Sequence, residues 1–192
     1  MPDLDHRLRR WSRVEYERLV ECGFFQPGDR VELIGGQLLV AEPQNSPHAT
    51  AVGLAEDALR EAFGRGWVVR VQAPIALDDE SEPEPDVAVV PGTRRDYRQG
   101  HPQRPVLAVE VADSSLVGDR TIKASLYARA GIADYWIVNL VERLVEVYRD
   151  PAPDPRAAYG WAYRRVQRQS EGAVISPLAL IGATVAVADI LP

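Results

Sequence analysis

The sequence predicts an α/β fold in which helices pack against one mixed β-sheet. Residues 48–63 have the period of a helix, three apolar strands follow, and a second helix over 119–130 precedes a strand at 135–139, which gives the order αβββαβ. A helix that connects strands 106–111 and 135–139 implies a right-handed crossover and a parallel pair. The chain has 192 residues, 46% of them hydrophobic, so we expect one domain over residues 1–192 with a single core.

Residues 11–41 are expected to form a helix and a β-hairpin before this core. Residues 12–15 (Ser-Arg-Val-Glu) have the form of a capping box and open an amphipathic helix over 16–22. Two short apolar runs, 30–34 and 37–40, are separated by a Gly-Gly pair, which is typical of a two-residue hairpin turn.

The core, about residues 46–140, contains the elements that would carry a functional site. Strands are expected at residues 67–71, 86–90 and 106–111. An acidic loop with two prolines, 78–85, leads into the second of these strands. Asp119 is expected to be the N-cap of the helix that follows the third.

The C-terminal part, residues 144–191, is expected to add strands to the sheet. A strand at 144–149 is followed by a proline-rich break at 151–155 and by a second strand at 161–167. The tail over 174–192 is apolar with little periodicity. Because the tail and strand 144–149 could bury a partner surface, a homodimer is one expectation.

Composition and charge restrict the class of protein. The net charge of −6 is unlike that of proteins that coat nucleic acid non-specifically, which normally have a basic face. No apolar stretch approaches the roughly 20 residues of a membrane span. One cysteine, Cys22, excludes an internal disulfide. We therefore expect a soluble, cytoplasmic protein without a membrane partner.

Three charged residues stand out around the predicted core. Lys123 is the only lysine among the 22 Lys and Arg residues, Asp86 opens one apolar strand, and Glu110 ends the next. Mg²⁺ is usually held by one or two carboxylates, and a cation of this kind assists phosphodiester hydrolysis. The alternative is structural: the carboxylates bind arginines or backbone amides, and Lys123 forms a surface ion pair with Asp119 four residues earlier.

Seven segments, in order, resemble the Uma-two family of restriction-endonuclease-like proteins in the PD-(D/E)XK nuclease superfamily. They are Arg30-Val-Glu-Leu-Ile-Gly-Gly, Pro47-His48, Val71-Gln-Ala-Pro-Ile, Ser81-Glu-Pro-Glu-Pro-Asp-Val-Ala, Val109-Glu-Val-Ala-Asp-Ser-Ser, Lys123 with Leu126-Tyr-Ala-Arg-Ala-Gly-Ile, and Tyr135-Trp-Ile-Val. The resemblance implies a restriction-endonuclease-like fold and a Mg²⁺-dependent endonuclease that hydrolyses nucleic acid, DNA in the first place, with Mn²⁺ as a substitute cation.

The resemblance also implies roles for individual residues. It assigns the two metal-binding carboxylates to Asp86 and Glu110. The superfamily lysine usually lies two residues after the second carboxylate, where this chain has Ala112, and the family resemblance moves its role to Lys123. Glu32 matches a family glutamate that supplies a further carboxylate, or it is an exposed strand residue.

Other readings remain open from the sequence. His48 and Gln72 match family positions without an assigned role, and the position of His48 beside Pro47 favours a helix N-terminal or core-edge histidine over a ligand. The acidic charge and Ala112 favour a binding or regulatory module that keeps the fold without turnover. A metal-dependent enzyme that acts on a small phosphate ester is also compatible with the net charge.

Overall fold

The computed structural model describes residues 8–26, 28–41 and 44–192, and its centre is a six-stranded mixed sheet with the order β3-β4-β5-β6-β7-β8. The strands are β3 (Trp67–Val71), β4 (Val87–Pro91), β5 (Leu107–Ala112), β6 (Asp134–Asn139), β7 (Leu144–Pro153) and β8 (Trp161–Ser170). Strands β5 and β6 are parallel, and the other neighbouring pairs are antiparallel. The predicted parallel pair and the α/β fold class are confirmed.

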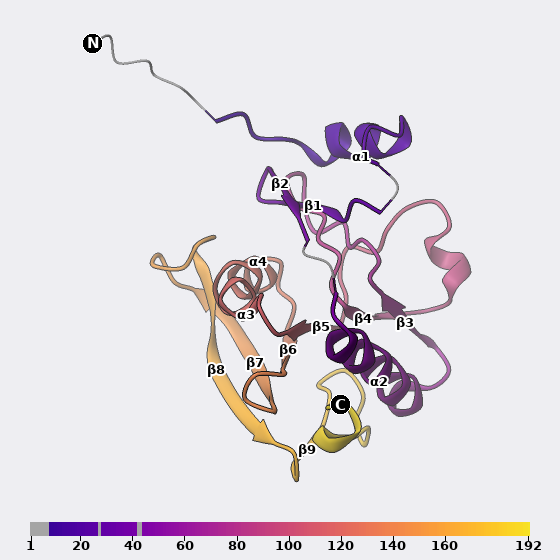
Figure 1. Cartoon of the computed structure of the whole chain (residues 1–192), viewed down its shortest axis with the longest axis vertical. Coiled ribbons are helices and arrows are strands. Elements are labelled where there is room, and N and C mark those ends of the chain that lie inside the picture. Colours follow the sequence, from indigo (N-terminus) through magenta and orange to yellow (C-terminus); the bar gives the residue numbers. More distant parts are fainter. Residues whose placement is uncertain (1–7, 27, 42–43) are drawn as a thin grey trace.

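Helices cover the two faces of this sheet (Figure 1). On one face, α2 (Ser46–Phe63) packs its buried side chains, among them Leu59 and Phe63, against strand residues such as Trp136. On the other face, α4 (Ala124–Arg129) packs Tyr127 against Tyr135 of β6. The order of α2, three strands, a helix and β6 is the predicted αβββαβ core.

The N-terminal elements match the prediction closely. Helix α1 (Arg13–Glu21) begins with the expected capping box between Ser12 and Glu15. Strands β1 (Val31–Ile34) and β2 (Gln37–Val40) form an antiparallel hairpin. Gly35 and Gly36 have φ of 55° and 76°, the left-handed values that a two-residue hairpin turn needs and that glycine adopts without strain.

The hairpin is fixed to the acidic loop that leads into β4. The backbone N–H of Glu82 donates to the carbonyl of Leu33 over 2.7 Å, and the N–H of Gly36 donates to the carbonyl of Glu80, also over 2.7 Å. These two hydrogen bonds hold β1 beside the entry to β4, although the two are about 50 positions apart in the sequence.

The helix after β5 differs from the prediction. It begins at α3 (Leu116–Gly118), passes through the π-helical segment η2 (Asp119–Lys123) and continues as α4. Asp119 is therefore not an N-cap. Its carboxylate accepts a hydrogen bond of 2.6 Å from the hydroxyl of Ser115, one turn earlier, and only 3% of the residue is exposed.

The break between β7 and β8 begins after Pro153 rather than at residue 151, where the proline-rich segment 151–155 predicted it. Strand β7 continues to Pro153, with Pro151 opposite Tyr163 and Pro153 opposite Trp161 of β8. Strand β6 pairs with β7 only as far as Arg149, so the prolines lie where β7 has no neighbour on that side. A proline that faces an open edge removes no ladder hydrogen bond, which explains why the strand tolerates both.

The C-terminal tail packs on the α2 face of the sheet, near α2 (Figure 1). It contains β9 (Val174–Ile175), β10 (Val185–Ala186) and the turn η3 (Val187–Asp189). Ile175, Val185 and Ile190 are buried in the same core as α2. These side chains, on which the homodimer expectation partly rested, are thus covered by the chain itself, and the homodimer stays a prediction.

Within the described ranges, no helix is long and apolar enough to cross a membrane.

Candidate active site

A cavity of about 400 Å³ opens between the β1–β2 hairpin, the start of α2, the entry to β4, the end of β5 and η2. Its charged lining consists of Arg30, Glu32, His48, Glu84, Asp86, Glu110, Asp113, Asp119 and Lys123. Five of these residues, Glu32, Asp86, Glu110, Asp119 and Lys123, are called the lysine cluster below.

Asp86 and Glu110 lie side by side because β4 and β5 are adjacent antiparallel strands. Asp86 immediately precedes β4, and Glu110 lies in β5, two residues before its end rather than at the end as predicted. The backbone N–H of Asp86 approaches Glu110 Oε2 at 3.4 Å, and the N–H of Val111 donates to Asp86 Oδ2 over 2.9 Å. The two carboxylates are 6% and 3% exposed by residue, so both are held at the floor of the cavity.

Asp86 is surrounded by hydrogen-bond donors. Gln72 Nε2 donates to Oδ1 over 3.1 Å, and His48 Nε2 lies 3.4 Å from Oδ2. Burial raises the pKa of Asp86, but the contacts with His48, Val111 and Gln72 together outweigh it, so its pKa lies below the ordinary value. Asp86 is therefore ionised at neutral pH, and the two residues without an assigned role in the sequence, His48 and Gln72, both contact it.

For Glu110, the effect of burial on the pKa exceeds the effect of its favourable contacts. Its Oε1 accepts a hydrogen bond of 2.6 Å from the hydroxyl of Tyr127 and lies 3.0 Å from Lys123 Nζ. Burial raises the pKa of Glu110 to about 8, although Lys123 lowers it, and the nearby carboxylates of Asp119 and Asp86 raise it further. The site therefore holds more carboxylates than its lysine can neutralise.

Lys123 lies at the centre of the cluster. Its Nζ is 3.0 Å from Glu110 Oε1 and 3.3 Å from Glu32 Oε2, and its side chain is 19% exposed. Burial lowers the pKa of Lys123, but Glu110, Glu32 and the other carboxylates raise it more, and the net value lies above the ordinary one. Lys123 is a partly buried cation that pairs with Glu110 and Glu32, so its interpretation as a surface ion pair with Asp119 is wrong.

Glu32 is likewise not the exposed strand residue that one alternative described, since it is 5% exposed and faces Lys123. The sequence does not indicate Asp119 as a site residue. Although it is predicted to be a helix N-cap, it lines the cavity, and burial raises its pKa against the opposing effects of Lys123 and Ser115. The spacing of four residues between Asp119 and Lys123 was the available signal.

The donors fit a small divalent cation held mainly by oxygen atoms. Four buried carboxylates face one ammonium group, so the lysine cluster has an excess of negative charge. Asp86 and Glu110 could supply the one or two carboxylates by which proteins usually hold Mg²⁺, with water and substrate oxygens as the remaining ligands. Among the described residues, no group of three or more His, Cys, Asp or Glu side chains is arranged so that it could hold a metal ion by itself. A cation here would therefore depend on two carboxylates together with water and substrate oxygens.

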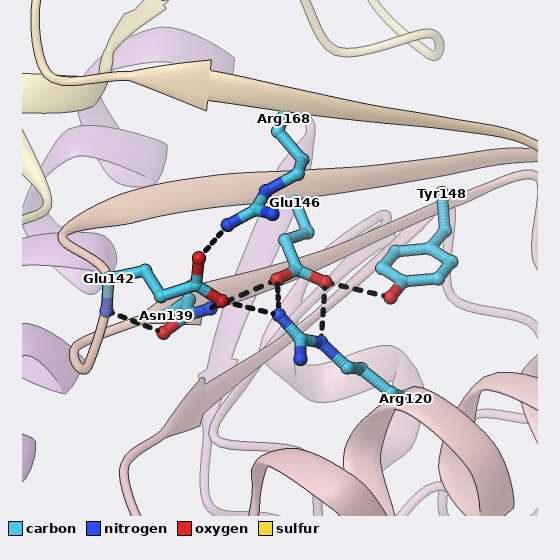
Figure 2. A network of polar contacts seen from close by, with 6 residues as sticks. All are labelled: Arg120, Asn139, Glu142, Glu146, Tyr148 and Arg168. Atoms are coloured by element: carbon cyan, nitrogen blue, oxygen red, sulfur yellow. Dashed lines mark hydrogen bonds and ion pairs between the residues drawn. The ribbon is translucent and has the colours of Figure 1, made fainter.

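A second polar group anchors η2 from its other side (Figure 2). Arg120 Nε donates to Glu146 Oε2 over 3.1 Å, and Arg120 also pairs with Glu142 at 2.9 Å. This group, called the Arg120 network below, consists of Arg120, Asn139, Glu142, Glu146, Tyr148 and Arg168. It ties the segment that contains Asp119 and Lys123 to β7, to the β6–β7 turn and to β8.

Comparisons with known proteins agree with this architecture. The family model described as "Uma2: Putative restriction endonuclease" matches residues 13–188. Among solved structures, the chain is similar to one described as "a putative nuclease belonging to DUF820" from Anabaena variabilis. The two are 13% identical and superpose with a TM-score of 0.66 over 94% of this chain and 97% of the other. At this identity the likeness shows the fold alone. No curated protein matches the chain.

Proposed function

Because the chain belongs to the Uma2 family of restriction-endonuclease-like proteins, we propose that it is a metal-dependent nuclease that hydrolyses phosphodiester bonds of nucleic acid, with DNA as the first polymer to test. The observation that carries the proposal is the lysine cluster. Two adjacent carboxylates and a buried ammonium group meet at the floor of one cavity.

Asp86 and Glu110 would hold the cation. When bound, Mg²⁺ or Mn²⁺ supplies charge neutralisation at the phosphate and lowers the pKa of an attacking water. Asp86 is ionised and oriented by the N–H of Val111 and by Gln72, so it needs no rearrangement to act as a ligand. Glu110 is held by Tyr127, which limits the rotation of its carboxylate.

Lys123 would stabilise the negative charge that develops on the phosphate during hydrolysis. Its ammonium group is buried and cationic, and a charge fixed in a poorly hydrated site acts more strongly than one in water. Glu32 lies 3.3 Å from the ammonium and would orient it. Ala112 occupies the usual lysine position, but it is buried between the sheet and α4, whereas Lys123 reaches Glu110 from the next helix. This contact weighs against the inactive-module alternative.

The test is a cleavage assay on single- and double-stranded DNA and RNA with Mg²⁺, with Mn²⁺ and with EDTA. We expect cleavage of at least one polymer with either metal and none with EDTA. Metal binding without cleavage of any polymer would instead support a binding module. Hydrolysis of nucleotides or simple phosphate diesters without cleavage of polymers would identify the small-substrate alternative.

A further inference from the structure

The cavity has apolar walls that hydrolysis does not require. Leu39 and Ile122 both line it and are 42% and 37% exposed. Leu39 lies opposite Glu32 in the hairpin, so the two side chains share the face that looks toward Lys123. Ile122 immediately precedes Lys123 on η2. Two aliphatic side chains from different elements therefore flank the lysine cluster, and a third, Ile34, is buried beneath them.

The same cavity has few cationic side chains that could bind successive phosphates of a nucleic-acid backbone. Proteins that bind duplex DNA contact successive phosphates mainly with Lys and Arg. Among the described residues of this lining, Arg30 and Lys123 are the permanent cations, and Lys123 is already paired with Glu32 and Glu110. Six lining residues are acidic. The walls therefore favour an apolar, uncharged group beside the single phosphate that reacts.

The size of the cavity also favours a single small group over a duplex. The cavity volume of about 400 Å³ lies in the range of small-ligand pockets, roughly 300–1,000 Å³. A sphere of that volume is roughly 9 Å across, narrower than the major groove alone of a B-form duplex, which is about 12 Å wide. One nucleotide fits this space, and a stacked duplex does not.

An amide at the cavity wall has unused hydrogen-bonding capacity. Gln44 Nε2 is buried and has no hydrogen-bond partner within the part of the chain that the structure describes. Gln44 lines the cavity together with Leu39 and Ile122. A buried amide N–H without a partner is unfavourable, and an acceptor on the edge of a nucleobase would satisfy it.

We infer that the substrate is nucleic acid with unpaired nucleotides, and that one unstacked base enters this cavity. The base packs between Leu39 and Ile122, its edge accepts a hydrogen bond from Gln44, and its phosphate lies at Lys123. The inference rests on the proposed nuclease function and specifies its substrate class as single-stranded or locally unpaired nucleic acid.

The decisive experiment measures binding rather than cleavage, so that it can fail separately from the proposed function. Fluorescence anisotropy with the wild-type protein and Ca²⁺ compares a labelled 12-nucleotide single strand with its blunt duplex and with the same duplex carrying three unpaired nucleotides. We expect the single strand and the interrupted duplex to bind at least tenfold more tightly than the blunt duplex. Equal or tighter binding of the blunt duplex, or binding of none of the three, would overturn the inference.

Substitutions in the apolar walls test whether single-strand binding takes place in this cavity. Leu39→Ala and Ile122→Ala should each weaken single-strand binding roughly tenfold, the scale of one buried aliphatic side chain. Val166→Ala on β8 and Val20→Ala on α1 are matched controls, since these valines are 48% and 52% exposed and do not line the cavity. The controls should bind as the wild type does. Unchanged binding by both cavity variants, with melting temperatures equal to the wild type, would contradict the inference, while efficient cleavage of blunt duplex would leave the nuclease function standing without it.

Discussion

The lysine cluster and the Arg120 network meet at the same five-residue segment, η2, and differ in how their charges balance. The lysine cluster places four carboxylates around one ammonium group. The Arg120 network places two carboxylates, Glu142 and Glu146, between two guanidinium groups, with Asn139 and Tyr148 as further donors (Figure 2). One group carries excess negative charge and the other is neutral.

Two glutamates with similar exposed fractions, of which Glu110 lies deeper in the protein, show what this difference does. Glu110 is 3% exposed and Glu146 is 2% exposed. Burial raises the pKa of both, yet Glu110 stays raised to about 8, whereas hydrogen bonds from Arg120, Asn139 and Tyr148 bring the pKa of Glu146 below its ordinary value. Burial alone therefore does not identify a functional carboxylate. We propose that unmet negative charge distinguishes a cation site from a structural network.

The largest expected effect comes from removing charge in the lysine cluster. Asp86→Asn and Glu110→Gln should each abolish metal-dependent stabilisation and reduce cleavage by roughly a thousandfold or more, because the cation supplies several kcal/mol of transition-state stabilisation. Thermal melts with and without Mn²⁺, together with cleavage rates, give the measurement. Asp154→Asn is the control, since this carboxylate pairs with the exposed Arg156 and does not line the cavity. Full metal stabilisation in both cluster variants would refute the assignment.

A second test asks whether the lysine is a compact ammonium or merely a counterion. Lys123→Arg keeps the positive charge but replaces three rotatable donors with a planar fork. If Lys123 acts at the phosphate, cleavage should fall by about a hundredfold while metal binding is retained, the scale for one lost transition-state contact. The assay compares wild type, Lys123→Arg and Lys123→Ala at saturating Mn²⁺. A near-wild-type cleavage rate for the arginine variant would mean that Lys123 only balances the negative charge of the neighbouring carboxylates.

The Arg120 network should respond in the opposite way. Glu146→Gln keeps the shape of the side chain but removes the charge between Arg120 and Tyr148, and should destabilise the fold by about 2 kcal/mol, the scale of a hydrogen bond to a charged group. Metal-dependent stabilisation should persist in this variant. Chemical denaturation and melts with Mn²⁺ measure the two effects separately. Loss of the metal effect without loss of stability would mean that the two groups are not distinct.

The sequence predicted what depends on local pattern. The Gly-Gly turn between short apolar runs gave the β1–β2 hairpin, and the helix between two strands gave the parallel β5–β6 pair. Because the two strands were expected to be adjacent, Asp86 was expected to lie near Glu110, and the structure confirms this proximity. The roles of the two residues stay predictions.

Contacts between distant segments leave no local pattern in the sequence. Lys123 meets Glu32 across 91 positions, which the family resemblance alone suggests by assigning both to one site, and Arg120 meets Glu146 across 26, which nothing in the sequence indicates. The burial of Asp119 follows from η2 packing over β5 and β6, as its carbonyl contact with the hydroxyl of Tyr135 shows. Strand propensity also could not reveal that the prolines of β7 face an edge without a neighbouring strand, because that depends on where β6 begins.

Glu82 has unmet charge away from the cavity, and its substitution should have the smallest of the four predicted effects. Glu82 is 2% exposed, its Oε2 makes no hydrogen bond within the described residues, and Arg13 and His101 lie only at 3.9 Å. Burial and the nearby Glu17 raise its pKa to about 7, against the opposing effect of Arg13. Glu82 does not line the cavity, so it has unmet charge without adjacent metal-binding carboxylates.

The sign of its effect on stability follows from the raised pKa. The folded protein holds the proton of Glu82 more tightly than the unfolded chain does, whose glutamate pKa is about 4.3. The favourable contribution is thus complete below that pH and is lost as the pH rises through about 7. Glu82→Gln cannot ionise, so its melting temperature should exceed that of the wild type by roughly 3 °C at pH 8, with the difference shrinking toward pH 5. Cleavage and metal stabilisation should stay at wild-type levels. A parallel loss of metal binding would show that unmet charge anywhere in this fold, and not the pairing of Asp86 with Glu110, attracts the cation.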